Sequence, residues 1–187
     1  RQRIESMKQE GAEVIVFAMH WGNEYERTPN SYQKQMAQKL ANFGVDIIIG
    51  GHPHVIQPME YLTSEVSGKK TLVLYSLGNF ISNQRREIIN NKYPEDGIIV
   101  NISLEKLPEG GAKVKSVNFI PTWVSRTQVD DNKYSYTILP LNEVVETSSS
   151  DILLEQDELA KAIDSYEETI ETFKALSTEP VLAPIMD

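Results

Sequence analysis

Residues 45–54 read VDIIIGGHPH, an apolar run that ends in two glycines and a pair of histidines. The run Val45–Ile49 is short and rich in β-branched residues, which predicts a buried strand. Upstream, Glu13–Met19 (EVIVFAM) is a second run of the same kind, and His20 follows it directly. Two predicted strands that each lead into histidine therefore organise the first third of the chain.

A helix is predicted between these two strands. Thr28 and Pro29 offer a capping hydroxyl and a proline for the first turn, and Gly44 offers a C-terminal stop. The apolar side chains with helical spacing are Tyr32, Met36, Leu40 and Phe43. Strand, helix and strand in this order form a βαβ unit, whose two strands run parallel. Residues 1–10 look like the end of a preceding helix.

The chain beyond residue 54 changes character, with short connections that favour antiparallel pairing. Strands are expected at Val55–Leu62, Lys70–Ser76, Gly97–Leu104 and Ala112–Phe119. Residues 82–96 are polar and predict a mobile surface loop, while residues 125–137 give an ambiguous pattern. The expected fold is therefore α/β, or α+β by some schemes.

The C-terminal part predicts one long helix. Apolar positions over Ile152–Leu176 recur with helical spacing: Leu153, Leu159, Ile163, Tyr166, Ile170 and Phe173. The tail with Pro180 and Pro184 is expected to be irregular. We expect residues 1–140 to be one domain and residues 141–187 to be an acidic helical appendage with an irregular tail docked on it.

Composition and charge exclude several classes of protein. The 187 residues are 40% hydrophobic and 24% charged, which is typical of a globular domain. No apolar run approaches the roughly 20 residues that cross a bilayer. Residues 141–180 hold 11 acidic and 2 basic side chains, and the remaining residues hold 16 of each. No basic surface for nucleic acid is therefore expected.

Cysteine is absent from the chain, so disulfides, thiolate metal sites and cysteine nucleophiles are excluded. A metal would have to be held by histidine, aspartate, glutamate or asparagine. His20 follows the first predicted strand, and His52 and His54 follow the second. The carboxyl ends of parallel strands meet at one edge of a sheet, where ligands collect. We therefore predict that these three histidines bind metal, rather than being surface or hydrogen-bonded core residues.

The flanking residues carry a resemblance. HWGNEY at residues 20–25, GGHPHV at residues 50–55 and YSLGNF at residues 75–80 resemble motifs of the CapA family. These are poly-γ-glutamate capsule biosynthesis proteins, which are similar to calcineurin-like metallophosphoesterases. The resemblance extends over about residues 1–125. It implies a metallophosphatase-like β-sandwich flanked by helices, of which this chain is the C-terminal portion, followed by the acidic helix.

The resemblance also implies a dinuclear site for two divalent metal ions of the Mn, Fe, Zn or Mg class. His20 and His52 would serve one ion and His54 its neighbour. The superfamily's earlier motifs, Asp-x-His, Gly-Asp-x-x-Asp and Gly-Asn-His, do not occur upstream of these histidines. Their ligands are expected from an upstream half of the same protein, so this chain alone should bind metal weakly or not at all. Without the resemblance, three histidines could also build a mononuclear zinc site.

Three further residues are candidates. Glu24 could act as a general acid/base, orient an imidazole, or be solvated beside Glu26 and Arg27. Trp21 is expected either to contact substrate or to pack. Asn79 is expected either to hydrogen-bond substrate or to form a turn.

These expectations lead to two functions. The first is a metal-dependent hydrolase of a phosphoester or an amide, and the second is a non-catalytic accessory protein that binds poly-γ-glutamate through the same metal pocket and helps its export. The expected substrate is an anionic polymer or a phosphorylated molecule. The resemblance implies location at the cell envelope or outside the cell, anchored to the membrane through an N-terminal segment missing from this sequence.

Overall fold

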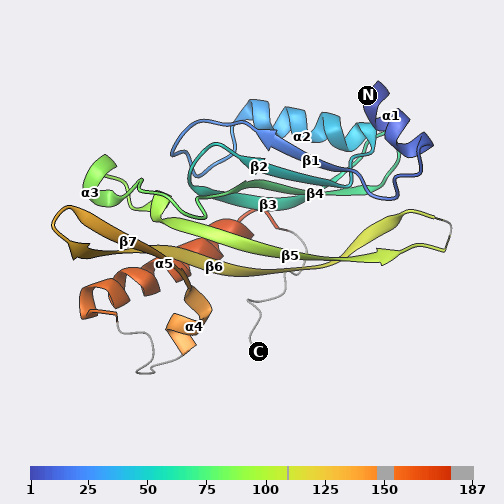
Figure 1. The fold of residues 1–187 in the computed structure, drawn as a ribbon. Coiled ribbons are helices and arrows are strands. Elements are labelled where there is room, and N and C mark those ends of the chain that lie inside the picture. Colours follow the sequence, from blue (N-terminus) through green and yellow to red (C-terminus); the bar gives the residue numbers. More distant parts are fainter. Residues whose placement is uncertain (109, 147–153, 178–187) are drawn as a thin grey trace.

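The computed structural model of this protein describes residues 1–108, 110–146 and 154–177. Two β-sheets lie face to face (Figure 1). The first sheet has the strand order β1 (Val16–His20), β2 (Ile47–Gly51), β4 (Lys70–Leu77) and β3 (Ile56–Thr63). The second sheet has the order β5 (Asp96–Lys106), β6 (Ala112–Asp130) and β7 (Lys133–Pro140). The predicted α/β fold with a β-sandwich is confirmed.

Helices flank both sheets. Helices α1 (Gln2–Gln9) and α2 (Ser31–Phe43) lie over the first sheet, where Ile4, Ala37 and Leu40 share a core with strand residues such as Ile48 and Val73. Helices α4 (Leu141–Glu146) and α5 (Gln156–Lys174) lie beside the second sheet (Figure 1). Two short helices, α3 (Arg86–Ile89) and the 3-10 helix η1 (Tyr93–Glu95), connect the two sheets.

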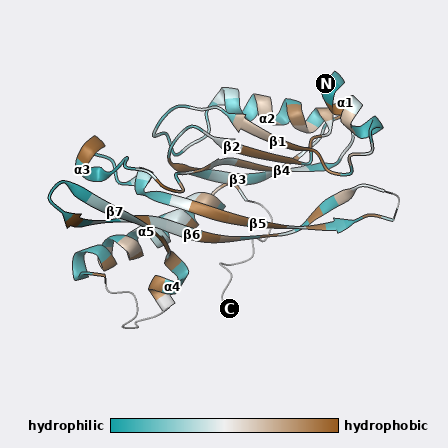
Figure 2. Cartoon of the chain, viewed as in Figure 1, coloured by the Kyte–Doolittle hydropathy of each residue, from teal (hydrophilic) through white to brown (hydrophobic). Residues whose placement is uncertain are grey.

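The core between the two sheets also receives side chains from α5. Leu72 and Leu74 of β4 pack in one cluster with Phe119 of β6 and Phe173 of α5. The rings of Phe119 and Phe173 lie 5.0 Å apart between centroids. Hydrophobic residues concentrate in the central strands, and hydrophilic residues in the loops (Figure 2). Complete burial of one such side chain contributes roughly 1.5–3 kcal/mol, so α5 is a substantial part of the fold. The domain boundary at residues 140/141 stays a prediction.

The parallel βαβ unit is confirmed, with β1 and β2 paired in parallel from Val16↔Ile47 to His20↔Gly51. The prediction that the first strand is buried is wrong. Strand β1 is at the edge of its sheet, and the side chain of Val16 is 48% exposed. Its alternating exposure reflects one face packed under helices and the other face open.

The predicted boundary and apolar face of α2 are shifted. Its cap is Asn30 rather than Thr28, because the Asn30 side chain accepts from the Gln33 backbone while the Gln33 side chain accepts from the Asn30 backbone. This capping box satisfies two free N–H groups at the helix start. The side chains that α2 buries are Gln33, Ala37, Leu40 and Ala41. Gly44 ends the helix with φ 83° as predicted.

Residues 82–96, predicted to be a mobile surface loop, include the short helices α3 and η1 and buried polar side chains. Arg85 is 5% exposed and donates from Nη1 to the Val124 carbonyl at 2.7 Å. Arg86 pairs with the buried Glu95, with Nη2 and Oε2 2.7 Å apart. Burial raises the pKa of Glu95, but the hydrogen bonds and charge of Arg86 outweigh it and leave that pKa lowered. The contacts of these polar residues with buried partners hold the segment against the rest of the fold.

The ambiguous residues 125–137 belong to the long hairpin of β6 and β7. The predicted late helix is confirmed as α5, and Tyr166, Ile170 and Phe173 of its predicted apolar face pack in the core. Its buried residues are Ala162, Ser165, Thr169 and Phe173. Leu159 and Ile163 are 38% and 39% exposed, because small residues let the helix approach the sheet on a face that does not include them. Residues 152 and 153 and the tail with Pro180 and Pro184 are outside the described residues.

A buried carboxyl joins α5 to the start of β5. Asp96 is 6% exposed, and Ser165 Oγ donates to Asp96 Oδ1 at 2.6 Å. Burial raises the pKa of Asp96 to about 7, with smaller raising effects from Glu95 and Glu168, and Ser165 and Arg27 oppose the shift. The folded protein therefore keeps a proton on Asp96 at a pH where the unfolded chain has released it.

Replacing Asp96 with asparagine is expected to change how stability depends on pH. Because the folded-state pKa is above the unfolded one, the stabilising contribution of Asp96 is complete below about pH 4 and is lost as pH rises through about 7. The free energy of unfolding of the natural protein should fall relative to Asp96→Asn over this interval, by about 4 kcal/mol at most. Urea unfolding from pH 4 to 8 measures the difference. Asp164→Asn, an exposed site on α5, is the control, and parallel curves for Asp96→Asn would contradict the prediction.

Candidate metal centre

The three histidines lie together at one edge of the first sheet. His20 is the last residue of β1 and pairs with Gly51, the residue before His52. The rings of His20 and His52 are 4.4 Å apart between centroids, and those of His52 and His54 are 6.1 Å apart. This proximity follows from the parallel register of β1 and β2. The role of the three residues as metal ligands stays a prediction.

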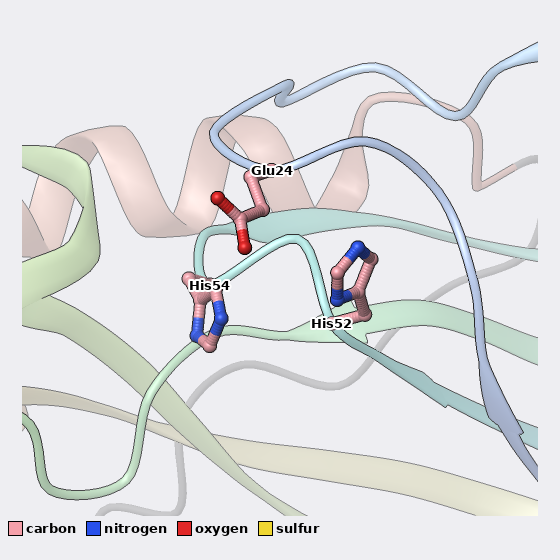
Figure 3. A group of neighbouring side chains, drawn as sticks. All are labelled: Glu24, His52 and His54. Atoms are coloured by element: carbon pink, nitrogen blue, oxygen red, sulfur yellow. The ribbon is translucent and has the colours of Figure 1, made fainter.

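Glu24 joins two of these histidines. One carboxylate oxygen of Glu24 and one ring nitrogen each of His52 and His54 lie within 4.8 Å of one another. Figure 3 shows the Glu24 carboxylate directed toward the two imidazoles. Glu24 is exposed and both histidines are half-buried, so solvent reaches the group. His20 is adjacent to it through its ring contact with His52.

Unusual backbone conformations concentrate at this group. Among the described residues, five that are not glycine have positive φ, and three of them are Tyr25 at 65°, His52 at 102° and His54 at 59°. A positive φ is unfavourable for a residue that carries a Cβ, and residues with this strain cluster at functional sites. Two backbone hydrogen bonds hold the conformation, from Tyr25 N to Pro53 O at 2.8 Å and from Trp21 N to Gly51 O at 3.1 Å. The two loops of the site thus support each other.

The two glycines before His52 differ in their surroundings. A Cβ on Gly50 would lie 2.0 Å from Tyr75 O and 2.4 Å from Trp21 Nε1, whereas a Cβ on Gly51 would meet nothing within 4 Å. The missing side chain of Gly50 leaves room for the hydrogen bond from Trp21 Nε1 to Tyr75 O, 2.9 Å long. Trp21 is 3% exposed, which leaves almost none of its indole for the predicted contact with substrate.

Asn79 contacts His54 rather than lying apart from the histidines. Its Oδ1 is 3.0 Å from His54 Nδ1, and its Nδ2 is within 3.2 Å of three oxygens, on His54, Gln84 and Pro94. The prediction that Asn79 binds substrate stays a prediction, and here its amide contacts protein partners. Sequence reasoning missed the Asn79–His54 pair because 25 residues separate the two and no local pattern links them.

The loop that carries Glu24 is held against α5 by Arg27, a residue that sequence reasoning treated only as part of a solvated loop. The Arg27 guanidinium donates to Glu168 O at 3.3 Å and to Thr172 Oγ1, and it lies 3.9 Å from the centroid of the Tyr93 ring. On the side of the first sheet, Gln57 Nε2 of β3 donates to Glu26 O at 2.7 Å. Helix α5 therefore contributes to the position of the Glu24 loop.

The same segment matches a known protein family. Residues 1–84 match the family described as "Bacterial capsule synthesis protein PGA_cap". This span holds Glu24, all three histidines and Asn79. Over residues 1–84, the chain is similar to this capsule synthesis family. The match with the CapA family ends before β5, short of the residue 125 or so to which the motif resemblance extended.

Two curated relatives of the CapA family are similar to part of the chain. "PGA biosynthesis protein CapA" of Bacillus subtilis (strain 168) is 42% identical over 73 residues, which are 39% of this chain and 18% of the relative. "Capsule biosynthesis protein CapA" of Bacillus anthracis is 38% identical over 77 residues, 41% of this chain and 17% of the relative. The chain thus matches less than a fifth of either relative's length. Among the described residues, no helix has the length and apolarity of a membrane span.

Proposed function

We propose that His20, His52 and His54 are ligands in one part of a dinuclear metal site, and that the complete protein is a metal-dependent hydrolase of capsule or poly-γ-glutamate biosynthesis. The observation that carries the proposal is the meeting of Glu24, His52 and His54 within 4.8 Å, beside His20. The bond cleaved would be a phosphoester or an amide. The capsule role of the family would locate the activity at the cell envelope, with a membrane anchor outside residues 1–187.

The residues present fit divalent metals of the Mn, Fe or Zn class. Imidazole nitrogen suits Fe and Zn, and carboxylate oxygen suits Mn and Mg. Ligating histidines commonly bond through the other ring nitrogen to an outer partner, as His54 does with Asn79 at 3.0 Å. Bound divalent metals would supply Lewis acidity toward a phosphate or amide oxygen and would make water a stronger acid.

Glu24 would serve proton transfer at this site. Its exposed carboxylate is near His52 and His54 yet open to solvent, so it can take a proton from water or return one to a leaving group. Arg27, bonded to α5, and Gln57, bonded to the Glu26 carbonyl, limit the movement of the Glu24 loop. Positioning of this kind is needed for a general base to stay within reach of its proton.

Further ligands would come from an upstream half of the same protein, outside residues 1–187. Strand β1 pairs with β2 on one side, and among the described residues no strand pairs with its other side. Val16 on this strand is 48% exposed, and His20 at its end is exposed too. An apolar edge strand is a ready surface for another strand, which could bring the missing ligands beside His20.

Glu24→Gln is expected to retain metal and to lose turnover in the longer protein. The amide keeps the shape of the side chain but cannot accept the proton, so kcat should fall about 10²–10⁴-fold. Hydrolysis of p-nitrophenyl phosphate and of poly-γ-glutamate, each with added Mn²⁺ or Zn²⁺, measures turnover, and elemental analysis measures metal. Glu26→Gln is the matched control, because Glu26 is an exposed carboxylate of the same loop that bonds only Asn23 through its side chain among the described residues. Unchanged turnover in Glu24→Gln would contradict the assigned role.

The alternative function is an accessory protein that binds poly-γ-glutamate without cleaving it. The exposure of Glu24 and His20 favours this alternative, because a long polymer can reach an open site more easily than a closed pocket. Metal ions would then neutralise the carboxylates of the polymer. Saturable, metal-dependent binding of poly-γ-glutamate by the longer protein, with no hydrolysis of either substrate, would favour binding over catalysis.

A further inference from the structure

We infer that Asn79 is a positioning residue that holds His54 in the tautomer with hydrogen on Nδ1, so that Nε2 is the only ring nitrogen with a free lone pair. The contact between Asn79 Oδ1 and His54 Nδ1 joins the segment just after β4 to the histidine loop after β2, across 25 residues of sequence. The tautomer follows from the chemistry of the neighbouring groups alone. Its consequence for metal binding rests on the proposed function.

The first step concerns the orientation of the Asn79 amide. Its Nδ2 is 3.0 Å from the carbonyl oxygen of Pro94 and 3.2 Å from that of His54. Backbone carbonyls only accept hydrogen bonds, so the NH₂ end of the amide must face them. A flipped amide would place its oxygen against two carbonyl oxygens and lose both bonds. The Oδ1 end therefore faces His54.

The second step concerns the ring of His54. Asn79 Oδ1 only accepts, and it lies 3.0 Å from His54 Nδ1. A bond between them exists only if Nδ1 carries the hydrogen. A neutral imidazole carries one hydrogen, so Nε2 is left as the acceptor. If a metal binds at this group, His54 must use Nε2.

The third step is that Asn79 is itself held in place. Its backbone N–H donates to Asp96 O at 3.2 Å. Gly97 passes so close that a Cβ there would lie 2.2 Å from Asn79 O, and Gly78 adopts φ 71° in contact with Asp96. The start of β5 and Pro94, two residues before it, thus anchor Asn79. Asp96 and Pro94 lie beyond residue 84, so part of this support comes from outside the matched family segment.

The tautomer can be measured directly in the metal-free chain. Long-range ¹H–¹⁵N correlation spectra of protein labelled at histidine distinguish the Nδ1–H and Nε2–H forms, and only three histidines contribute. Spectra at about pH 8.5, above the ordinary range of imidazole protonation, report the neutral rings. His54 should show protonated Nδ1 and unprotonated Nε2. An Nε2–H form in the natural protein would overturn the inference.

Two variants test whether Asn79 is the cause. Asn79→Ala removes the acceptor and should convert His54 into a mixture of the two tautomers. Asn79→Asp keeps an acceptor toward His54 and should keep the Nδ1–H form. Asn83→Ala is the matched control, because Asn83 is an exposed residue of the same segment whose Oδ1 bonds Tyr136. An unchanged Nδ1–H form in folded Asn79→Ala, or its loss in folded Asn79→Asp, would overturn the inference. If either variant fails to fold, the spectrum of the natural protein still decides.

A metal titration separates this inference from the proposed function. With Zn²⁺ or Mn²⁺ and the longer protein, Asn79→Ala should weaken affinity by about 10–100-fold, the usual effect of losing an outer partner. Absence of metal uptake by the natural protein, with Nδ1–H on His54, would reject the metal site and leave the tautomer assignment standing. Normal uptake with an Nε2–H form would reject the positioning role alone.

Discussion

Replacement of both His52 and His54 by alanine is expected to abolish stoichiometric metal uptake by the longer protein. Two of the three proposed histidine ligands are removed together, and they are the two that lie in one group with Glu24. The loss should exceed the about 10–100-fold typical of an outer partner such as Asn79. Folding should be retained, because both side chains are half-buried and their removal loses little packing.

Elemental analysis after exhaustive dialysis measures this effect, and circular dichroism checks the fold. Lys34→Ala, an exposed position on α2 away from the histidine loops, is the control for handling. Each single variant should lower metal content less than the double one. Full metal content in the double variant would show that these histidines are not the ligands.

Gly50→Ala is expected to destabilise the fold by about 3 kcal/mol or more, at or above the upper end of typical overpacking effects. The new Cβ would lie 2.0 Å from Tyr75 O, a backbone atom of the central strand β4, and 2.4 Å from Trp21 Nε1. A strand backbone cannot move aside without breaking its ladder, so β2 and β4 must separate locally. The buried bond from Trp21 to Tyr75 would be lost with this movement.

Urea unfolding measures the stability change, with Gly51→Ala as the matched control. Gly51 is the next residue, and a Cβ there meets no atom within 4 Å, so its substitution should cost less than about 1 kcal/mol. Equal losses in the two variants would indicate that the close approach at Gly50 has no energetic consequence. A larger loss for Gly50→Ala would show that position 50, just before the histidine loop, requires a residue without a side chain.

Local pattern was sufficient for the strands and the helix of the first 51 residues and for their order. β-branched runs at Val45–Ile49 and Glu13–Met19 predicted strands, and a helix between them predicted parallel pairing, which is the pairing of β1 and β2. Parallel strands end at the same edge, so the meeting of His20 with His52 could be predicted from the positions of these residues alone. The presence of Glu24 beside them could be suspected from its place on the His20 loop.

Local pattern was insufficient wherever a polar residue is buried by a partner distant in sequence. Arg85 lies in the segment predicted to be a mobile surface loop, yet its guanidinium donates to the carbonyl of Val124 in the second sheet. Gln33 is buried on the face of α2 that packs on the sheet, because its Nε2 donates to Gln57 on β3 at 2.8 Å. Such residues look hydrophilic in any window of sequence, and only the partner across the fold makes their burial favourable.

The sequence by itself determined the first two strands, the parallel unit that they form and the edge at which the three histidines gather, because hydrophobic spacing and chain direction are local properties. Only the tertiary structure decided that Glu24, His52 and His54 form the tightest group, that Asn79 contacts His54, and that α5 holds the Glu24 loop through Arg27. These contacts join segments 25 to 145 residues apart. Hydrogen-bond geometry at such separations depends on how the two sheets and α5 pack, which no short stretch of sequence specifies.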